Sequence, residues 1–240
     1  MKTKNILVMS GKGGVGKTTI AVNLAQYLFQ KGFAVGLLDV DLHGPNALKM
    51  LGFKDVKLGV VNEKLEPKII DPRFKVASIA GFIDDNSALI WRGPRKHGAI
   101  KQLIEETDWG PLDYLVIDFP PGTGDEHIST AQLLKENSYC LIISTPQSVS
   151  IMDMKRAIDF CNQMELPIIG VIENMSGDIF GKGTIEKECN FLNKKFLGAL
   201  PLSKDINDSS EQGKPFFLAK DSSVSLTFNS IAKKIMEEIK

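Results

Sequence analysis

The sequence has few cysteines, no excess of charge of either sign and no long apolar run. Its three cysteines, Cys140, Cys161 and Cys189, are too few and odd in number for a disulfide framework. Lysine plus arginine and aspartate plus glutamate both number 29, so the basic excess typical of DNA-coating or membrane-surface proteins is missing. No apolar run reaches the length of a membrane span, and residues 1–5 lead into a strand-like run rather than a signal peptide. These absences predict a cytoplasmic protein without a nucleic-acid or membrane partner.

Short apolar runs alternate with longer amphipathic stretches. The runs are Ile6–Met9, Ala34–Leu38, Tyr114–Ile117, Cys140–Ile143, Pro167–Ile172 and Phe196–Leu200. They are continuously apolar, as expected for strands covered on both faces. Thr18–Gln30 and Ser148–Met164 carry apolar residues at helical spacing. This alternation predicts an α/β fold with a doubly wound, mainly parallel sheet and right-handed crossovers.

Two segments depart from this alternation. Residues 52–88 are broken by glycine and proline, and we interpret them as an irregular surface excursion of a single domain 1–240, with a short strand at Lys75–Ala80. Ser222–Ile239 has apolar residues along one helical face. A membrane-targeting helix would look similar, but the mixture of lysine and glutamate on the polar face favours a helix docked on the core.

A glycine-rich segment follows the first apolar run. Ser10–Thr19 reads SGKGGVGKTT and fits G-x-x-x-x-G-K-[ST]. Glycines let backbone N–H groups turn inward around phosphate oxygens, and the N-terminus of the following helix attracts the same anion. The pattern predicts that Lys17 contacts the β and γ phosphates of ATP and that the Thr18 hydroxyl ligates Mg²⁺, rather than a plain glycine-rich turn. The predicted nucleotide-binding residues are Gly11, Lys12, Gly13, Gly14, Val15, Gly16, Lys17, Thr18 and Thr19.

Lys12 is a second lysine in this loop. It is either a solvated loop charge or a cation that faces strong negative charge, because its proximity to Lys17 is otherwise unfavourable. The stretch KGGVGKT at 12–18 resembles the deviant loop of MinD/ParA-type ATPases and of the nitrogenase iron protein. In those families this lysine reaches the partner's ATP across a nucleotide-sandwich dimer. The resemblance implies a homodimer in which Lys12 acts in trans, much as an arginine finger does.

Acidic residues end two of the expected strands. Asp39 and Asp41 occupy alternate positions after an apolar run and therefore point the same way from an extended chain. One can support the magnesium shell and the other can orient water, whereas strand-end capping is the simpler alternative. Residues 115–118 read LVID, a Walker-B-like pattern in which Asp118 holds magnesium through water. The proline- and glycine-rich turn Phe119–Asp125 suits a switch that senses the γ-phosphate.

Several segments together resemble the Mrp family of iron–sulfur cluster carrier ATPases. They are Ser10–Thr19, Asp39–Asn46 (DVDLHGPN), Trp91–Pro94 (WRGP), Leu112–Asp125 (LDYLVIDFPPGTGD), Ser144–Gln147 (STPQ) and Val171–Ser176 (VIENMS). The resemblance implies a P-loop fold like that of MinD and the nitrogenase iron protein, with Asp41 activating water and Asp39 nearer the metal. It also implies that Asn174 contacts adenine and that Pro201 packs on the base. On sequence alone, Asn174 is equally well explained as a turn residue.

Cysteine placement departs from the family pattern. The family usually carries a Cys-x-x-Cys shortly after its Val-Glu-Asn-Met-Ser-like motif, and two such cysteines from each subunit would hold a shared cluster. Residues 176–184 contain no cysteine. Cys189 is the nearest thiol and the candidate cluster ligand, whereas Cys140 and Cys161 lie in an apolar strand and a helix as packing residues. Two copies of Cys189 supply only two ligands, so we expect weak cluster binding.

The sequence therefore predicts a homodimeric, magnesium-dependent ATPase that acts in iron–sulfur or related metallocluster assembly, with a client protein as partner. Lys12, Lys17 and Asp41 are its expected catalytic residues, and Thr18, Asp39 and Asp118 its expected magnesium site. The alternative is a metal-free MinD/ParA-like switch that recruits a protein partner; the missing Cys-x-x-Cys favours it, and the WRGP and PPGTGD matches oppose it. A small-molecule kinase would need an acceptor pocket, for which we find no sequence signal.

Overall fold

The structure is a computed structural model. It describes residues 2–41, 44–53, 56–57, 59–61, 64–82, 93–122, 125–219 and 222–239. Trp91 and Arg92 of the WRGP segment, and Thr123 and Gly124 of the turn expected to sense phosphate, lie outside the described residues.

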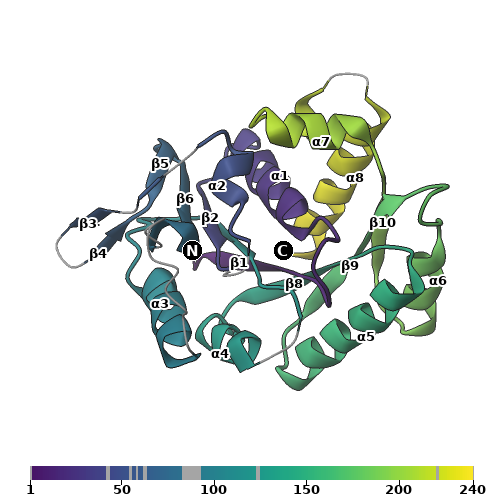
Figure 1. Cartoon of the computed structure of the whole chain (residues 1–240), viewed down its shortest axis with the longest axis horizontal. Coiled ribbons are helices and arrows are strands. Elements are labelled where there is room, and N and C mark those ends of the chain that lie inside the picture. Colours follow the sequence, from purple (N-terminus) through teal and green to yellow (C-terminus); the bar gives the residue numbers. More distant parts are fainter. Residues whose placement is uncertain are drawn as a thin grey trace.

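An eight-stranded sheet forms the centre of the molecule, with the strand order β10-β9-β8-β1-β7-β2-β6-β5 (Figure 1). The strands are β1 (Lys4–Met9), β2 (Val35–Asp39), β5 (Lys68–Asp71), β6 (Phe74–Ser78), β7 (Tyr114–Asp118), β8 (Ser138–Ser144), β9 (Ile168–Ser176) and β10 (Phe196–Pro201). All neighbouring strands are parallel except β5 and β6. The predicted doubly wound, mainly parallel sheet is confirmed. The chain moves to opposite sides of β1 for β2 and β8, and ligands of such sheets bind where the strand order reverses in this way.

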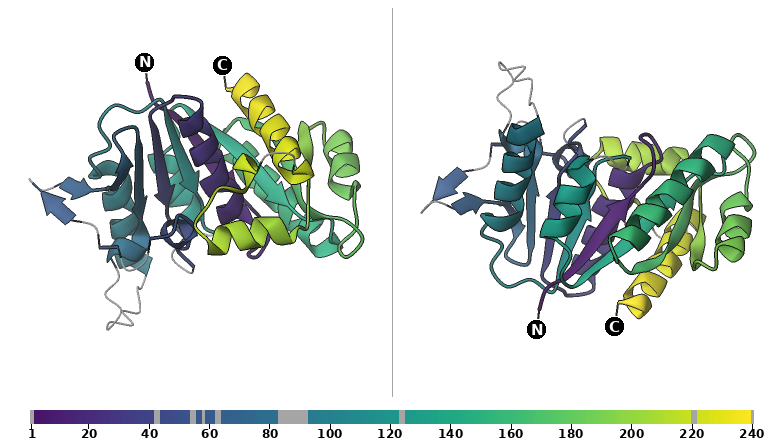
Figure 2. Two further views of the ribbon diagram at one scale, coloured as in Figure 1. Left: turned by 90° about the horizontal axis from the view of Figure 1, so that it is seen from above. Right: turned by 90° about the horizontal axis from the view of Figure 1, so that it is seen from below.

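Two helical layers cover the sheet. One contains α1 (Lys17–Gln30), α2 (Ala47–Met50), α7 (Lys204–Glu211), the short 3₁₀ helix η2 (Phe216–Leu218) and α8 (Ser223–Glu238); the other contains α3 (Gly93–Glu105), α4 (Asp125–Leu133), α5 (Ser148–Gln163) and α6 (Thr184–Phe191). The left view of Figure 2 looks onto the first layer and the right view onto the second. In β1, Ile6 and Val8 belong to the first core, whereas Leu7 and Met9 belong to the second. Burial on both faces explains why the central strands contain continuous apolar runs rather than alternating polar and apolar residues.

Residues 52–88 differ in part from the expected surface excursion. A two-stranded antiparallel sheet does occur here, made of β3 (Gly59–Val61) and β4 (Lys64–Glu66). The strand expected at Lys75–Ala80 corresponds to β6, which pairs with β2 in the main sheet rather than lying in a surface excursion. The 3₁₀ helix η1 (Ile79–Phe82) follows it. Phe74 and Val76 are buried, so the glycines and prolines around β6 interrupt the sequence pattern but not the core.

The C-terminal helix is docked on the core, as expected. Val224, Phe228, Ile231 and Ile235 of α8 are buried, and α8 lies against β10 and α1. Within the described parts of the chain, no helix combines the length and the apolar character that crossing a membrane requires.

Candidate nucleotide site

The glycine-rich loop joins β1 to α1. Some of its glycines are required by a left-handed backbone conformation, and others because a Cβ atom would clash with neighbouring atoms. Gly14 and Gly16 have φ angles of 78° and 83°, which side-chain-bearing residues rarely adopt. A Cβ on Gly16 would lie 2.2 Å from Nδ2 of Asn174, and one on Gly11 would lie 2.0 Å from the carbonyl oxygen of Asp153. The loop therefore lies directly against β9 on one side and α5 on the other.

A cavity of about 930 Å³ opens beside this loop, within the usual size range of ligand pockets. The predicted nucleotide-site residues that line it are Lys12, Gly13, Gly14, Gly16, Lys17, Thr18, Thr19, Asp41, Asn174 and Pro201. The cavity continues between α2 and α7, where Lys49 and Asn207 line its walls. Gly11 and Val15 do not line it, because Gly11 packs on Asp153 and Val15 is buried in the core.

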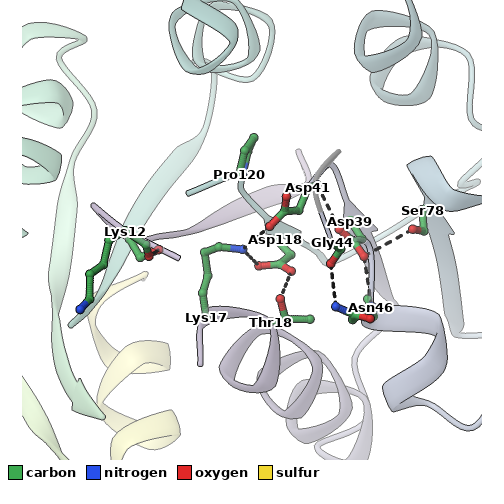
Figure 3. A network of polar contacts seen from close by, with 12 residues as sticks. Lys12, Lys17, Thr18, Asp39, Asp41, Gly44, Asn46, Ser78, Asp118 and Pro120 are labelled. Carbon is green, nitrogen blue, oxygen red and sulfur yellow. Dashed lines mark hydrogen bonds and ion pairs between the residues drawn. The ribbon is translucent and has the colours of Figure 1, made fainter. Parts of the chain in front are cut away.

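Charged groups from three elements meet at one end of the cavity (Figure 3). Nζ of Lys17 lies 2.5 Å from Oδ1 of Asp118 and 3.7 Å from Oδ2 of Asp41. The Thr18 hydroxyl donates to Oδ2 of Asp118 at 2.6 Å. The β2–β7 register places Asp39 beside Asp118 at the ends of these strands. The structure thus brings together Lys17, Thr18 and the three predicted aspartates, and their oxygens are of the hard type that Mg²⁺ prefers.

Asp39 is held by the segment that follows its strand. Its carboxylate accepts hydrogen bonds from the backbone N–H groups of Asp41 and Ala47, both at 3.1 Å, and from the Ser78 hydroxyl at 3.4 Å. Burial and the neighbouring Asp118 raise the pKa of Asp39 to about 8, although the backbone hydrogen bonds and Lys17 oppose the shift. Burial also raises the pKa of Asp118, and Lys17 only partly offsets it. A divalent cation would stabilise both carboxylates in their charged form.

The two lysines of the loop point in different directions. Lys17 is buried against Asp118, whereas Lys12 extends away from this cluster in Figure 3. Nζ of Lys12 lies 3.3 Å from Oε1 of Gln147, in the segment between β8 and α5. Its ammonium group is therefore not directed at the acidic end of its own cavity.

Asn174 and Pro201 both lie on the cavity wall. Nδ2 of Asn174 donates to the Val15 carbonyl at 2.8 Å, so one amide hydrogen binds the phosphate loop itself. Its carbonyl oxygen and second amide hydrogen can still pair with a ligand. Pro201 ends β10 beside Leu202 and Ser203, which also line the cavity. Contact of these residues with adenine remains a prediction.

Glu173 is a structurally important residue that our sequence analysis missed. It is fully buried, and its carboxylate accepts from the Ser176 hydroxyl at 2.6 Å and from the backbone N–H groups of Gly183 and Ile185 at 2.9 and 3.0 Å. It therefore caps the N-terminus of α6 from a neighbouring strand. The sequence did contain a signal for this role, namely a charged residue inside an otherwise apolar strand. Such a charge is rarely buried without partners, so its position could have indicated a hydrogen-bonded carboxylate.

Cys189 does not occupy the position expected of a cluster ligand. Its side chain is fully buried in the core between α6 and the sheet. Burial, with smaller contributions from Glu173, Glu186 and Glu188, raises the pKa of this thiol to about 11, whereas iron is bound by thiolate. The burial of this thiol does not favour a role as a cluster ligand, and that role stays a prediction. Cys189 follows the buried Ile185 by four residues, a helical spacing that could have indicated an inward-facing thiol.

Cys140 and Cys161 were expected to be packing residues, and the structure confirms this. Both are fully buried, in β8 and α5 respectively.

Together, the loop between β1 and α1, the aspartate that ends β7 and the cavity beside them define a P-loop nucleotide-binding protein. The sequence model of the family described as "ParA: NUBPL iron-transfer P-loop NTPase" matches residues 2–236, and the chain belongs to this family. The iron-sulfur cluster carrier protein of Methanocaldococcus jannaschii is 42% identical over 98% of this chain and 84% of its own length. The cytosolic Fe-S cluster assembly factor NUBP2 homolog of Dictyostelium discoideum is 46% identical, over 88% of this chain and 86% of its own. The resemblance to cluster carriers that the motifs indicated is confirmed.

Solved structures agree with this assignment. The nucleotide-binding protein of Archaeoglobus fulgidus in complex with ADP is 32% identical, with a TM-score of 0.75 over 89% of this chain and 87% of that chain. The septum site-determining protein MinD of Pyrococcus horikoshii, complexed with Mg-ADP, has a TM-score of 0.77 over 98% of this chain and 96% of that chain. Its identity is only 23%, so the likeness to MinD supports the fold alone.

Proposed function

We propose that this protein is a magnesium-dependent ATPase that works as a homodimer in the cytosol and carries iron–sulfur clusters to client proteins. The observation that carries the proposal is the meeting of Lys17, Thr18 and Asp118 at one end of a nucleotide-sized cavity. The cargo is supported by relatives named as a cluster carrier protein and a cytosolic cluster assembly factor. The metal-free switch is less well supported, because nothing in those names describes it.

ATP binding would exchange one set of ion pairs for another. Lys17 pairs with Asp118 in this structure, and in the proposal it turns to the β and γ phosphates. Thr18 and Asp118, with Asp39 behind them, would hold Mg²⁺ directly or through water. Bound Mg²⁺ would neutralise phosphate charge. Lys17 would exchange Asp118 for the phosphates, and Asp118 would exchange Lys17 for Mg²⁺. Because each exchange leaves both groups with a partner of opposite charge, we expect nucleotide and metal to bind together.

Hydrolysis would transfer the γ-phosphoryl group to water. Asp41 lines the cavity 3.7 Å from Nζ of Lys17, and we assign it the orientation of the attacking water. Asp39 holds the Asp41 backbone through a 3.1 Å hydrogen bond and so positions this carboxylate. Catalysis of this kind depends on positioning and electrostatic stabilisation.

A second subunit would complete the site. The direction of Lys12 supports a role in trans, since its ammonium group points away from the acidic cluster of its own subunit. A cation supplied from the partner would stabilise charge on the transferred phosphoryl group. The isolated subunit should therefore hydrolyse ATP slowly.

The substitution Asp41→Asn tests this proposal. It keeps the side-chain shape but removes the carboxylate, so we expect ATP binding to persist, phosphate release to fall, and an ATP-bound dimer to accumulate. Phosphate release with and without Mg²⁺, and light scattering after size-exclusion chromatography, measure these effects. Unchanged turnover in Asp41→Asn would show that Asp41 is only a structural strand end.

A further inference from the structure

His127 lies in the first turn of α4 and is almost fully buried, with 3% of its surface exposed. Its Nε2 atom lies 3.0 Å from the backbone carbonyl oxygen of Pro120. A carbonyl oxygen only accepts hydrogen bonds, so Nε2 carries a proton and donates it in this contact. The ring also packs against two aromatic side chains, with centroid distances of 5.8 Å to Phe119 and 6.2 Å to Phe160. The hydrogen bond and the packing together fix the orientation of this imidazole.

The carbonyl that His127 binds belongs to the turn after β7. Pro120 lies two residues after Asp118, at the acidic end of the nucleotide cavity (Figure 3). The next residue, Pro121, lines that cavity. The N–H of Gly122 donates to the carbonyl of Ser10 at the start of the phosphate loop, at 3.1 Å. The turn therefore connects the strand that ends in Asp118 to the cavity wall and to the phosphate loop.

The described part of this turn, residues 119–122, has few backbone groups that could fix its conformation. Pro120 and Pro121 have no backbone N–H to donate. Gly122 has a φ angle of 99°, and its N–H is already bound to the phosphate loop. The imidazole of His127 thus supplies from α4 a hydrogen bond that the turn cannot make by itself.

Helix α5 connects His127 to the phosphate loop by a second route. Phe160, which the imidazole contacts, follows Asp153 by seven residues, so both lie on the same face of α5 about two turns apart. The Asp153 backbone packs closely on the loop, because a Cβ on Gly11 would lie 2.0 Å from its carbonyl oxygen. His127 therefore contacts two elements that both pack on the phosphate loop.

We infer that His127 is a positioning residue for ATP hydrolysis, which acts through the Pro120 carbonyl and holds the turn after Asp118 against the γ-phosphate. This inference rests on the proposed ATPase function. His127 does not itself line the cavity, so its effect reaches the nucleotide through the turn. Lys17 and the loop glycines bind the phosphates whether or not the turn is held. Loss of the hydrogen bond should therefore lower kcat and leave KM for ATP nearly unchanged.

Two substitutions separate the hydrogen bond from the packing. His127→Phe keeps an aromatic ring beside Phe119 and Phe160 but removes the donor. His127→Gln removes the ring but can place an amide N–H near the position of Nε2. We expect kcat to fall about 10–100-fold in His127→Phe, the fold-change that corresponds to a buried carbonyl left without its donor. His127→Gln should recover most of the wild-type rate. Phosphate release over a range of ATP concentrations, at constant Mg²⁺, gives kcat and KM separately.

A loss of stability alone must be distinguished from a loss of positioning. The matched control is Leu134→Ala, just after the end of α4, which removes packing from the same buried cluster. Its melting temperature should fall while kcat stays at the wild-type value. A wild-type kcat in His127→Phe, an equal loss in His127→Gln, or an equal loss in Leu134→Ala would each overturn the positioning role.

Nitrogen NMR of the histidine rings in the wild-type protein tests the same hydrogen bond if His127→Phe does not fold. The His127 signals are assigned by their absence from His127→Gln. We expect Nε2 to be protonated and its proton to exchange slowly with solvent, and a ring protonated at Nδ1 alone would overturn the inference. Absence of Mg²⁺-dependent ATP hydrolysis by wild type would refute the proposed ATPase and this inference together. Active wild type with an equally active His127→Phe would refute the inference alone.

Discussion

Two helices of this protein begin in the same way but have different surroundings. α1 starts after Gly16 and α6 after Gly183, and both glycines have left-handed backbone angles. Because glycine has no side chain, neither residue can cap its own helix with a side-chain group. At α6, the buried Glu173 carboxylate occupies the N–H groups of Gly183 and Ile185. At α1, the start of the helix opens on a cavity that contains Lys17 and Thr18. A helix that begins after a left-handed glycine can therefore bind an anion only where no protein group already accepts hydrogen bonds from its first backbone N–H groups.

The loops that precede α1 and α6 differ in the same way as the two helix starts. Both contain a lysine between two glycines, Lys12 in the phosphate loop and Lys182 in the loop before α6. Lys12 lines the nucleotide cavity, whereas Lys182 is exposed at the entrance to a helix whose cap is already filled. We therefore expect equivalent substitutions in the two loops to differ widely in effect, and Lys182→Ala serves as a matched control.

Of the substitutions in the two loops, Lys12→Ala should reduce the rate of ATP hydrolysis most. We expect ATP binding to persist, while hydrolysis falls by about 10³–10⁵, the usual contribution of a cation supplied in trans, and ATP-dependent dimerisation is lost. Lys182→Ala should match wild type. Steady-state phosphate release and light scattering in the presence of ATP check both outcomes, and normal turnover by monomeric Lys12→Ala would contradict the sandwich arrangement.

Lys17→Ala should have the next largest effect, on binding rather than on turnover alone. Removal of this buried cation eliminates charge-assisted contacts with phosphate, so we expect ATP affinity to fall about 100-fold. Calorimetric titration with ATP and Mg²⁺ measures the change. A thermal melt must accompany it, because the buried Asp118 carboxylate also loses its partner. ATP binding as tight as that of wild type would refute the assigned phosphate site.

Glu173→Ala should act on stability. It leaves the buried N–H groups of Gly183 and Ile185 without their acceptor, and we expect the free energy of unfolding to fall by about 2–4 kcal/mol. Glu186→Ala, an exposed acid in the first turn of α6, should cost about 0.3–1 kcal/mol through the helix dipole. Denaturant titration compares the two. Equal losses would mean that the Glu173 cap contributes no more than a surface charge.

The smallest effect is expected at the cysteines. Iodoacetamide at pH 8 should label none of them in the native protein and all three after unfolding in guanidinium. The raised pKa of Cys189, about 11, means that the folded state favours the neutral thiol. This contribution to stability is present below the unfolded value near pH 9 and is lost as pH rises through 11. Cys189→Ser should leave ATPase activity unchanged, and rapid native labelling of Cys189 would contradict its burial.

Much of the fold and part of the site could be predicted from the sequence. The apolar strands and the α1 and α8 helices were recognisable because each pattern lies within one short segment. The strand β6 was recognisable, but its place in the main sheet was not, because the glycines and prolines that flank it resemble those of a surface loop and its pairing with β2 is non-local. The inward direction of the Cys189 thiol was not recognised, because its helix is mostly polar and only the packing of one face reveals which way the thiol points.

By itself, the sequence determined the phosphate loop, since its glycines, Lys17 and Thr18 lie within eight consecutive residues and their chemistry depends on local geometry. Only the tertiary structure decided what those residues meet. Asp118 reaches Lys17 across 101 positions, and Asn174 reaches Val15 across 159. Strand order and register place them together, and these depend on burying both faces of one sheet at once. The same packing turned Lys12 outward, enclosed Cys189 and filled the cap of α6, because each depends on neighbours that are distant in the chain.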